Sequence, residues 1–416
     1  MSLIDFIEIL ELIAKEYGSF ILGAATLLFT ILYGGRQYQK FVKHRIDDLE
    51  GQVDAAKQQV NQFKAEIDAH KQLLELAEKD RNAVRAKLAR IQLAFSGSDE
   101  QNVWLKGPID PPDNYHKRMS DSIPILLIAN LKGGVGKTTI AANLVPYFEK
   151  VHNERVLAID LDYQGSLSSM LLPEPYNREP RLAQTLKDLL GGKADSLAML
   201  GMTRPVRDTI RDSRIVDCDD PFANFETRLL MQWITGEVQS DIRYGLAKAL
   251  LDPAIQNQFQ RVIIDAPPRM TTGFVNALCA STHLVVPFVL DILSAERVGL
   301  FINQLQRMQP QLFPHLKPAG VVGTMKRTDT EQIADAELAA FSEAQTRVQC
   351  SWGSGDYVLR TAPIPRKQSI SNAAGLRIAY NESSDAESIF KRLGSHIVQR
   401  APGRQNANRL ASEAAE

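Results

Sequence analysis

Hydrophobic and polar positions follow three different patterns along the chain. Residues 17–35 contain no charged side chain. After residue 46, apolar positions recur in alternating steps of three and four up to residue 95. Beyond residue 122, short apolar runs alternate with stretches of helical periodicity. In this order, the patterns predict a transmembrane helix, a coiled-coil helix, and an α/β domain with a doubly wound, mostly parallel sheet.

The uncharged segment at residues 17–35 predicts a single membrane span. About 19 residues form a helix of roughly 28 Å, which is close to the thickness of the hydrocarbon core. Acidic side chains precede the segment, and basic ones follow it: Arg36, Lys40, Lys43 and Arg45. By the positive-inside rule, we expect a single-pass protein of the inner membrane, anchored in the lipid bilayer, with its C-terminal bulk in the cytoplasm. The alternative is a buried core helix of a soluble domain, since the run is short for a span.

The heptad pattern predicts that residues 36–95 form a basic juxtamembrane segment and a coiled coil that pairs two copies. Several seam positions carry residues that pack poorly, namely Ala56, His70, Ala77 and Arg81. A lone amphipathic helix that folds back on the following domain is the alternative. Residues 1–16 form a short N-terminal segment ahead of the span.

Residues 96–121 contain several glycines and prolines and are expected to form a linker. We expect Trp104 and Tyr115 in this linker to dock on the domain at residues 122–400. Residues 401–416 show no apolar period and are expected to form a flexible tail.

The amino-acid composition excludes few classes of function. A chain of 416 residues is long enough for one large α/β domain with accessory segments. Its 48 basic and 49 acidic residues give a net charge of −1, so charge alone gives no reason to expect nucleic acid. The three cysteines, Cys218, Cys279 and Cys350, are far apart. They therefore suggest neither a disulfide framework nor a paired-thiolate metal site.

A phosphate-binding motif lies between a predicted strand and a predicted helix. An apolar run at residues 123–129 precedes the motif, and helical periodicity begins at Ile140. In such a motif glycines let backbone N–H groups face the phosphates, while Lys137 can reach the β- and γ-phosphates and the Thr138 hydroxyl can hold Mg²⁺. The expected nucleotide-binding residues are Gly133, Gly134, Val135, Gly136, Lys137, Thr138 and Thr139. The sequence therefore predicts a site for a nucleotide and Mg²⁺, and the resemblance described next implies that the nucleotide is ATP.

A second lysine, Lys132, stands at the start of this motif, where a standard phosphate loop needs no cation. With it, the motif resembles that of the ParA/MinD family, whose members are ATPases with a deviant Walker A motif. Residues 156–165 and 262–268 resemble the family's second motif and its Walker B strand, with Tyr163 where proline is usual. Residues 362–366 resemble the loop near the adenine. The resemblance covers about residues 122–400.

The resemblance implies roles for individual residues. Lys132 would reach the partner's phosphates in a nucleotide-sandwich homodimer, Lys137 would act on the phosphates of its own subunit, and Asp162 would orient the attacking water. Hydrolysis would be slow until a partner completes the site. The remaining assignments are Thr138, Asp160 and Asp265 near Mg²⁺, and Pro365 near the adenine.

The function that this resemblance implies is a membrane-anchored, ATP-dependent dimerisation switch that recruits or positions an unidentified protein partner or cargo. One alternative is a DNA-partition ATPase that binds DNA non-specifically through basic residues near the C-terminus, namely Lys391, Arg392, Arg400, Arg404 and Arg409. A second alternative is a membrane tyrosine autokinase of polysaccharide export. Such kinases carry a C-terminal tyrosine cluster, whereas the last tyrosine here is Tyr380.

Overall fold

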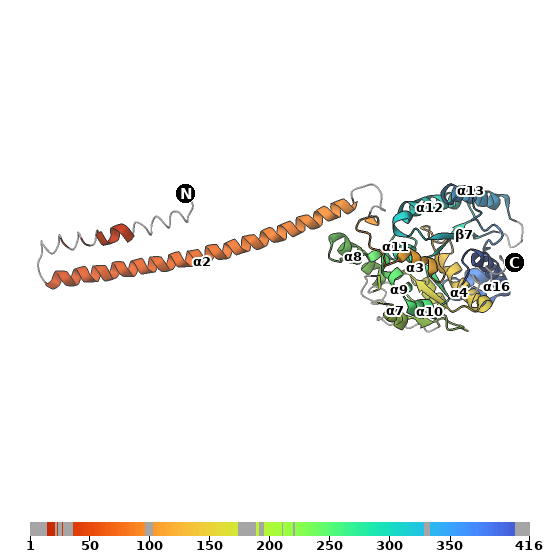
Figure 1. Cartoon of the computed structure of the whole chain (residues 1–416), viewed down its shortest axis with the longest axis horizontal. Helices are drawn as coiled ribbons and strands as arrows, with labels where there is room; N and C mark the ends of the chain where they lie inside the picture. The colour runs from red at the N-terminus through yellow and green to blue at the C-terminus, as the bar shows by residue number, and fades with distance from the viewer. Residues whose placement is uncertain are drawn as a thin grey trace. The chain divides into compact units, whose positions relative to one another are not determined.

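The computed structural model describes residues 15–20, 23, 27, 36–95, 103–173, 189–190, 195–209, 211–218, 221–327 and 333–403. The chain divides into two compact units, Met1–Lys87 and Leu88–Glu416. The first unit contains most of one long helix, and the second contains a sheet with helices around it (Figure 1).

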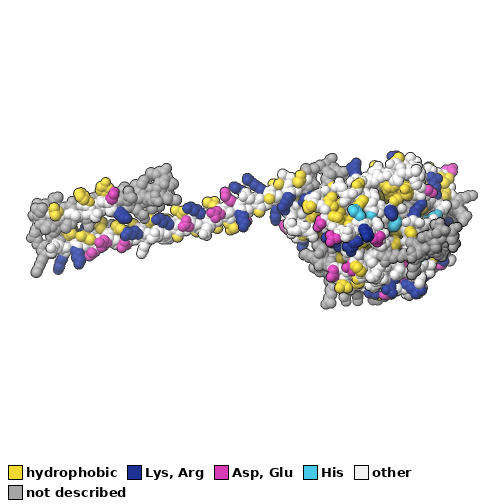
Figure 2. Space-filling model, viewed as in Figure 1, with side chains coloured by type: hydrophobic (Ala, Val, Ile, Leu, Met, Phe, Trp, Pro, Cys, Tyr) yellow, Lys and Arg dark blue, Asp and Glu magenta, His cyan; other side chains and the backbone are white. Residues whose placement is uncertain are grey.

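Helix α2 (Arg36–Phe95) is continuous over 60 residues. It contains no proline and a single glycine, Gly51, so little in its sequence disfavours helical hydrogen bonding. Charged side chains of both signs and hydrophobic side chains are interspersed along it (Figure 2). Four of its apolar heptad positions are largely solvent-exposed: Val53, Phe63, Leu74 and Val84. The pairing of two such helices stays a prediction.

The predicted single-pass topology in the inner membrane is wrong. Among the residues that the structure describes, no helix has both the length and the apolar character needed to cross a bilayer. The longest described helix, α2, carries charged side chains in successive turns, and each would be costly in hydrocarbon. Most of residues 17–35 lie outside the described part of the chain. The prediction rested on the length and apolar composition of the run and on the charges that flank it, and neither shows what covers a run this short.

A seven-stranded sheet forms the centre of the second unit, in the order β3-β4-β2-β5-β1-β6-β7. All neighbouring strands are parallel except β3 and β4. Central strands of a parallel sheet are buried on both faces and therefore read as continuous apolar runs, as β1 and β5 do. The predicted mostly parallel α/β fold is confirmed. The strands are β1 (Ile125–Ile128), β2 (Val156–Asp160), β3 (Arg204–Pro205), β4 (Arg214–Val216), β5 (Arg261–Asp265), β6 (His283–Val289) and β7 (Lys317–Thr324).

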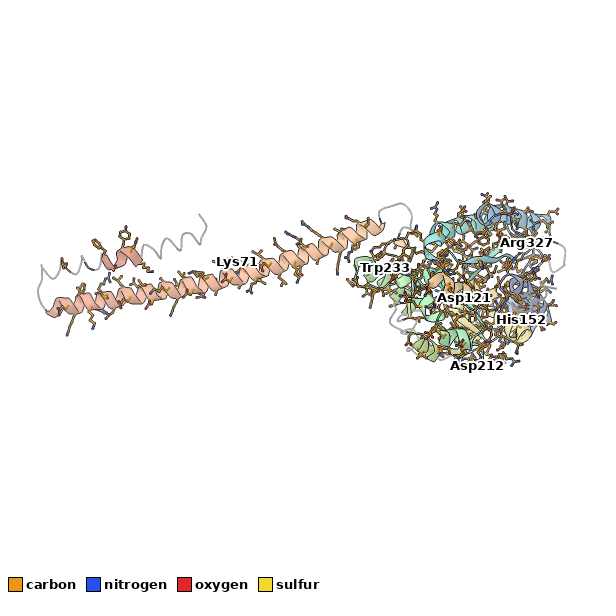
Figure 3. The ribbon with its side chains drawn as sticks, in the orientation of Figure 1. Lys71, Asp121, His152, Asp212, Trp233 and Arg327 are labelled. Atoms are coloured by element: carbon orange, nitrogen blue, oxygen red, sulfur yellow. The ribbon has the colours of Figure 1, made fainter. Side chains whose placement is uncertain are left out.

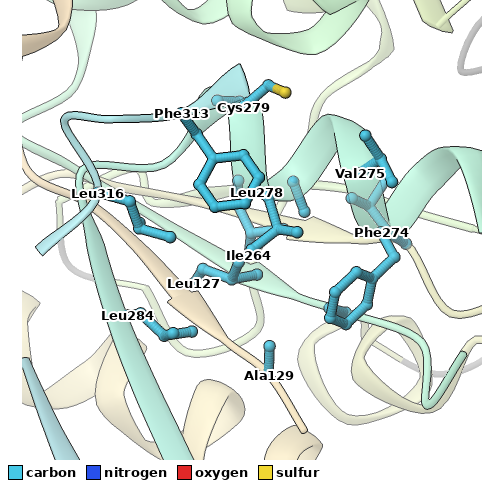
Figure 4. Packing of buried hydrophobic residues seen from close by; sticks show 14 of the residues in the cluster. Leu127, Ala129, Ile264, Phe274, Val275, Leu278, Cys279, Leu284, Phe313 and Leu316 are labelled. Carbon is cyan, nitrogen blue, oxygen red and sulfur yellow. The ribbon is translucent and has the colours of Figure 1, made fainter. Parts of the chain in front are cut away.

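Helices cover both faces of the sheet, and side chains along a strand alternate between the two layers. Leu126 and Ile128 of β1 belong to one hydrophobic cluster, with residues of α4, α15 and α16. Leu127 belongs to the other, in which it lies with Ile264 beneath α11 (Figure 4). The helices of this unit are α3 (Tyr115–Asp121), α4 (Lys137–His152), α5 (Ser166–Leu171), α7 (Ser196–Met202), α8 (Pro221–Thr235), η2 (Ile242–Tyr244), α9 (Gly245–Leu250), α10 (Pro253–Gln258), α11 (Thr272–Ala280), α12 (Ile292–Leu312), α13 (Asp335–Trp352), α14 (Gln368–Ala373), α15 (Ala379–Glu382) and α16 (Ser384–Arg400).

The connector between α2 and the sheet packs into the core of this unit. Trp104 and Tyr115 are each 3% exposed, so the prediction that they dock on the domain is confirmed. A fully buried arginine, Arg243, donates hydrogen bonds to the carbonyl oxygens of Trp104 at 2.7 Å and Pro108 at 2.8 Å. Its guanidinium also lies 4.9 Å from the ring centre of Trp233. Trp233, which Figure 3 labels, is a residue of α8. The connector is therefore a structural part of the domain.

Candidate functional site

The phosphate loop connects the end of β1 to the start of α4, as predicted. Gly134 and Gly136 have φ angles of 71° and 84°, a region that side chains disfavour and glycine adopts freely. Lys137 is the first residue of α4, so the loop leads directly into a helix N-terminus with free N–H groups. Backbone amides and a helix dipole thus converge where phosphates would bind.

Two carboxylates end adjacent strands beside this loop, because Asp160 of β2 and Asp265 of β5 are register partners. The Thr138 hydroxyl donates a hydrogen bond of 2.7 Å to Oδ2 of Asp265. The other oxygen, Oδ1, is buried and has no hydrogen-bond partner. Burial and the neighbouring Asp160 raise the pKa of Asp265 well above its usual value. Because buried carboxylate oxygens normally accept hydrogen bonds, the unpaired Oδ1 of Asp265 is unusual.

Asp160 differs from Asp265 because protein groups engage both of its oxygens. The backbone N–H and the hydroxyl of Ser168 donate to Oδ2 at 2.9 and 2.7 Å, and the N–H of Asp162 donates to Oδ1 at 3.1 Å. Burial raises the pKa of Asp160 to about 7. Asp162 is partly exposed, and its own Oδ1 accepts a hydrogen bond from the N–H of Gln164. Asp160 thus fixes the loop that presents Asp162.

The two lysines of the motif occupy different surroundings. Lys137 donates a hydrogen bond of 3.2 Å to the carbonyl oxygen of Lys132, and burial lowers the pKa of its ammonium. Lys132 instead extends to α12, where its ammonium lies 2.5 Å from the hydroxyl of Ser294. That hydroxyl donates to Asp291 at 2.8 Å. The Lys132 side chain therefore contacts α12, while its carbonyl oxygen accepts from Lys137.

The segment that contains Pro365 runs beside the end of β7. The N–H of Lys326 donates to the carbonyl oxygen of Ile364, and Lys326 pairs with Pro365 in a parallel bridge. The hydroxyl of Thr324, the last residue of β7, donates to the carbonyl oxygen of Val135 at 3.1 Å. The structure thus brings Pro365 to the side of the phosphate loop.

Comparisons with known proteins agree with this geometry. The AAA domain family matches residues 123–318. The sporulation initiation inhibitor protein Soj of Bacillus subtilis is 31% identical over 201 residues, which are 48% of this chain and 72% of Soj. The chromosome partitioning protein ParA of Caulobacter vibrioides is 28% identical over 292 residues, which are 69% of this chain and 98% of ParA. The chain belongs to the ParA/MinD family of P-loop ATPases.

Solved structures show the same fold. McdA of Cyanothece without nucleotide has a TM-score of 0.54 and 19% identity, with 66% of this chain and 99% of McdA covered. A McdA variant in complex with ATP has a TM-score of 0.53 and 18% identity, with 66% and 96% covered. The predicted P-loop NTPase fold is therefore confirmed.

This ParA/MinD-family chain departs from the usual motif at Tyr163, which follows Asp162. The Tyr163 hydroxyl accepts a hydrogen bond of 3.0 Å from Arg269. Arg269 belongs to residues 266–271, the segment between β5 and α11, which we call the switch loop. The tyrosine thus joins the loop after β2 to the switch loop.

Three polar residues around the family's site were not predicted from sequence: Asp291, Ser294 and Glu226. Asp291 and Ser294 stand three residues apart at a helix start, and the Asp291 side chain caps α12 by accepting from the N–H of Ser294 at 2.7 Å. That spacing is a recognisable capping pattern. Glu226 lies in a stretch of sequence without a motif, so no comparable signal marks it.

Proposed function

We propose that this chain binds ATP and Mg²⁺ and hydrolyses ATP as a dimerisation switch that recruits or positions a partner or cargo. The observation that carries the proposal is the position of Lys132. Its ammonium donates a hydrogen bond to Ser294, a residue of α12. Once it leaves Ser294, this cation can act on the nucleotide of a second copy, as the family resemblance implies.

The residues present fit ATP and Mg²⁺. Gly134 and Gly136 provide a backbone that can face phosphates. The unpaired Oδ1 of Asp265 and the Thr138 hydroxyl provide oxygen atoms of the kind that Mg²⁺ prefers. The described residues contain no cluster of three or more His, Cys, Asp or Glu that could hold a metal ion, so phosphates and water would be the remaining Mg²⁺ ligands. The ATP complex of the McdA variant supports the choice of nucleotide.

Each residue has a separate task in hydrolysis. The bound Mg²⁺ would neutralise charge on the phosphates. Lys137 adds positive charge at the phosphate loop, and Lys132 of the second copy adds more. Asp162, which is partly exposed, orients the attacking water, while Asp160 fixes the loop that carries Asp162. Pro365 would contact the adenine, as the family resemblance implies.

The test uses the native cysteines of the full chain. Cys350 is exposed, whereas Cys218 and Cys279 are buried, so a donor and an acceptor dye can be placed selectively on Cys350. We expect ATP to increase energy transfer between the two domains of a dimer. The change should occur even if α2 already pairs the chains, because the dyes report on the ATPase domains.

Substitutions separate the roles of the residues. Lys132→Ala should bind ATP but show neither the increase in transfer nor hydrolysis, and Lys137→Ala should lose ATP binding itself. Asp162→Ala should bind ATP, keep high transfer, and hydrolyse ATP about a hundredfold more slowly, as expected for a lost water-positioning group. Equal binding defects in the two lysine variants would contradict the proposal.

The second part of the proposal concerns α2, whose apolar heptad face we assign to a parallel coiled coil with a second copy. Exposure of Phe63 and Leu74 (55% and 66%) supports a face that a partner covers. Phe63→Glu with Leu74→Glu should lower the mass of the nucleotide-free protein in analytical ultracentrifugation from dimer to monomer. Glutamate at Gln58 and Lys79, off the apolar seam, is the matched control and should leave the mass unchanged.

DNA partition remains the second candidate, because relatives such as the ParA of Caulobacter vibrioides are named for chromosome partitioning. Two of the basic residues first considered for this role already have partners: Lys391 pairs with Glu387 at 2.8 Å, and Arg400 donates to the carbonyl oxygen of Ala319. A binding constant for DNA that falls steeply with salt would support this candidate. The autokinase alternative has no support, since the ring of Tyr380 is buried.

A further inference from the structure

A buried carboxylate outside the family motifs contacts the end of the switch loop. Glu226 of α8 is 6% exposed, and its Oε1 accepts a hydrogen bond of 2.5 Å from the N–H of Gly273. Gly273 is the second residue of α11, the helix that begins where the switch loop ends. The hydroxyl of Thr271, the last residue of the switch loop, also hydrogen-bonds to Glu226. Glu226 therefore caps α11 from a separate helix.

Three contacts consequently fix the switch loop. Its first end follows Asp265, which bonds to Thr138. Arg269 in its middle bonds to Tyr163, next to Asp162. Glu226 fixes the other end. A side-chain oxygen that accepts from an N–H in the first turn of a helix satisfies a donor that has no helical partner.

Helix α8 is itself a firmly attached support for this carboxylate. Leu229, Trp233 and Ile234 of α8 are buried in the core. At its C-terminal end, Arg90 and Lys106 donate hydrogen bonds of 2.8 and 2.9 Å to the carbonyl oxygens of Thr235 and Ile234. Cations suit a helix C-terminus, where carbonyl oxygens lack helical partners. The C-terminal half of α8, which follows Glu226, is thus attached to the core of the domain.

We propose that Glu226 is a positioning residue for ATP hydrolysis, which sets the place of the switch loop relative to Asp162 through its contacts with Gly273 and Thr271. The inference rests on the proposed ATPase function. Glu226 lies close enough to Asp162 for the two negative charges to interact, and burial together with this charge raises the pKa of Glu226 to about 7. Its contacts act on the loop rather than on the nucleotide, so its loss should slow turnover more than it weakens ATP binding.

The experiment compares variants of the full chain by steady-state hydrolysis and by binding of a fluorescent ATP analogue. Glu226→Ala should lower kcat about tenfold or more while the Kd for the analogue changes by less than about threefold, since small misplacements of catalytic groups are costly in rate. Glu226→Gln keeps an oxygen acceptor for Gly273 and should recover most of the rate. Arg228→Ala, on the exposed side of α8, is the matched control and should match the wild type.

The outcomes separate this inference from the proposed function. A wild-type rate no higher than that of Lys137→Ala would overturn both. An active wild type with an equally active Glu226→Ala would overturn the inference alone. Equal losses of kcat and ATP binding in Glu226→Ala, without rescue by Gln, would mean that Glu226 only stabilises the fold, and would also overturn it.

Discussion

Replacing Arg243 by methionine should destabilise the ATPase domain strongly. Methionine keeps most of the length of the arginine but removes its charge and all its donors. The guanidinium is fully buried and donates to Asp241 at 2.7 and 2.5 Å. Asp241 is 6% exposed in the wild type, and in the variant it would keep the N–H donors of Asp110 and residue 243 but lose its charged partner. Breaking a buried ion pair by removing one partner typically costs about 3 to 5 kcal/mol.

Tryptophan fluorescence during urea unfolding measures this cost, because Trp104 and Trp233 both contact Arg243. The double variant Arg243→Met with Asp241→Asn removes the stranded charge. Its loss should be clearly smaller than the sum of the two single losses, since contacting residues do not act independently. The reasoning would be refuted if Arg243→Met lowered the free energy of unfolding by less than about 1 kcal/mol.

Three further predictions concern single positions. Gly136→Ala should cost about 1 to 2 kcal/mol of backbone strain and weaken ATP binding, because its φ is 84° while its added Cβ would lie an ordinary 3.6 Å from Thr324. Glu226 has a pKa raised from 4.5 to about 7, so its stabilising contribution is complete below 4.5 and is lost as pH rises through about 7. Glu226→Gln should therefore gain stability relative to the wild type between about pH 5 and about pH 8 in thermal unfolding. Arg90→Ala should speed hydrogen exchange at the C-terminal end of α8, because Thr235 loses its donor.

The phosphate loop and the central strands could be predicted because their signals are local. The glycines, Lys137 and Thr138 lie within one short stretch, and buried parallel strands read as unbroken apolar runs. The carboxylates Asp160 and Asp265 could be placed together for a related reason. Each ends such a run, and parallel strands bring their carboxyl ends to one edge of the sheet.

Hydropathy failed at residues 17–35 for the opposite reason. The length and composition of an apolar segment determine how much apolar surface it has, but they do not show whether lipid or protein covers that surface. The same limit applies to α2, whose periodicity gave the helix correctly and says nothing of what its apolar face contacts. A local sequence pattern is thus enough to predict a helix or strand, but not enough to predict what its apolar face contacts.

Residues whose role depends on a distant partner show this most clearly. Lys132 and Ser294 are 162 positions apart, Arg243 and Trp104 are 139 apart, and Glu226 and Gly273 are 47 apart. Each contact joins two residues that no local sequence pattern pairs. The motif gives Lys132 its chemistry, but only the fold places that lysine on α12 instead of in its own phosphate loop. Because the proposed switch requires Lys132 to leave Ser294, the free energy of that contact opposes dimerisation, and Ser294→Ala should lower the ATP concentration at which the domains approach each other.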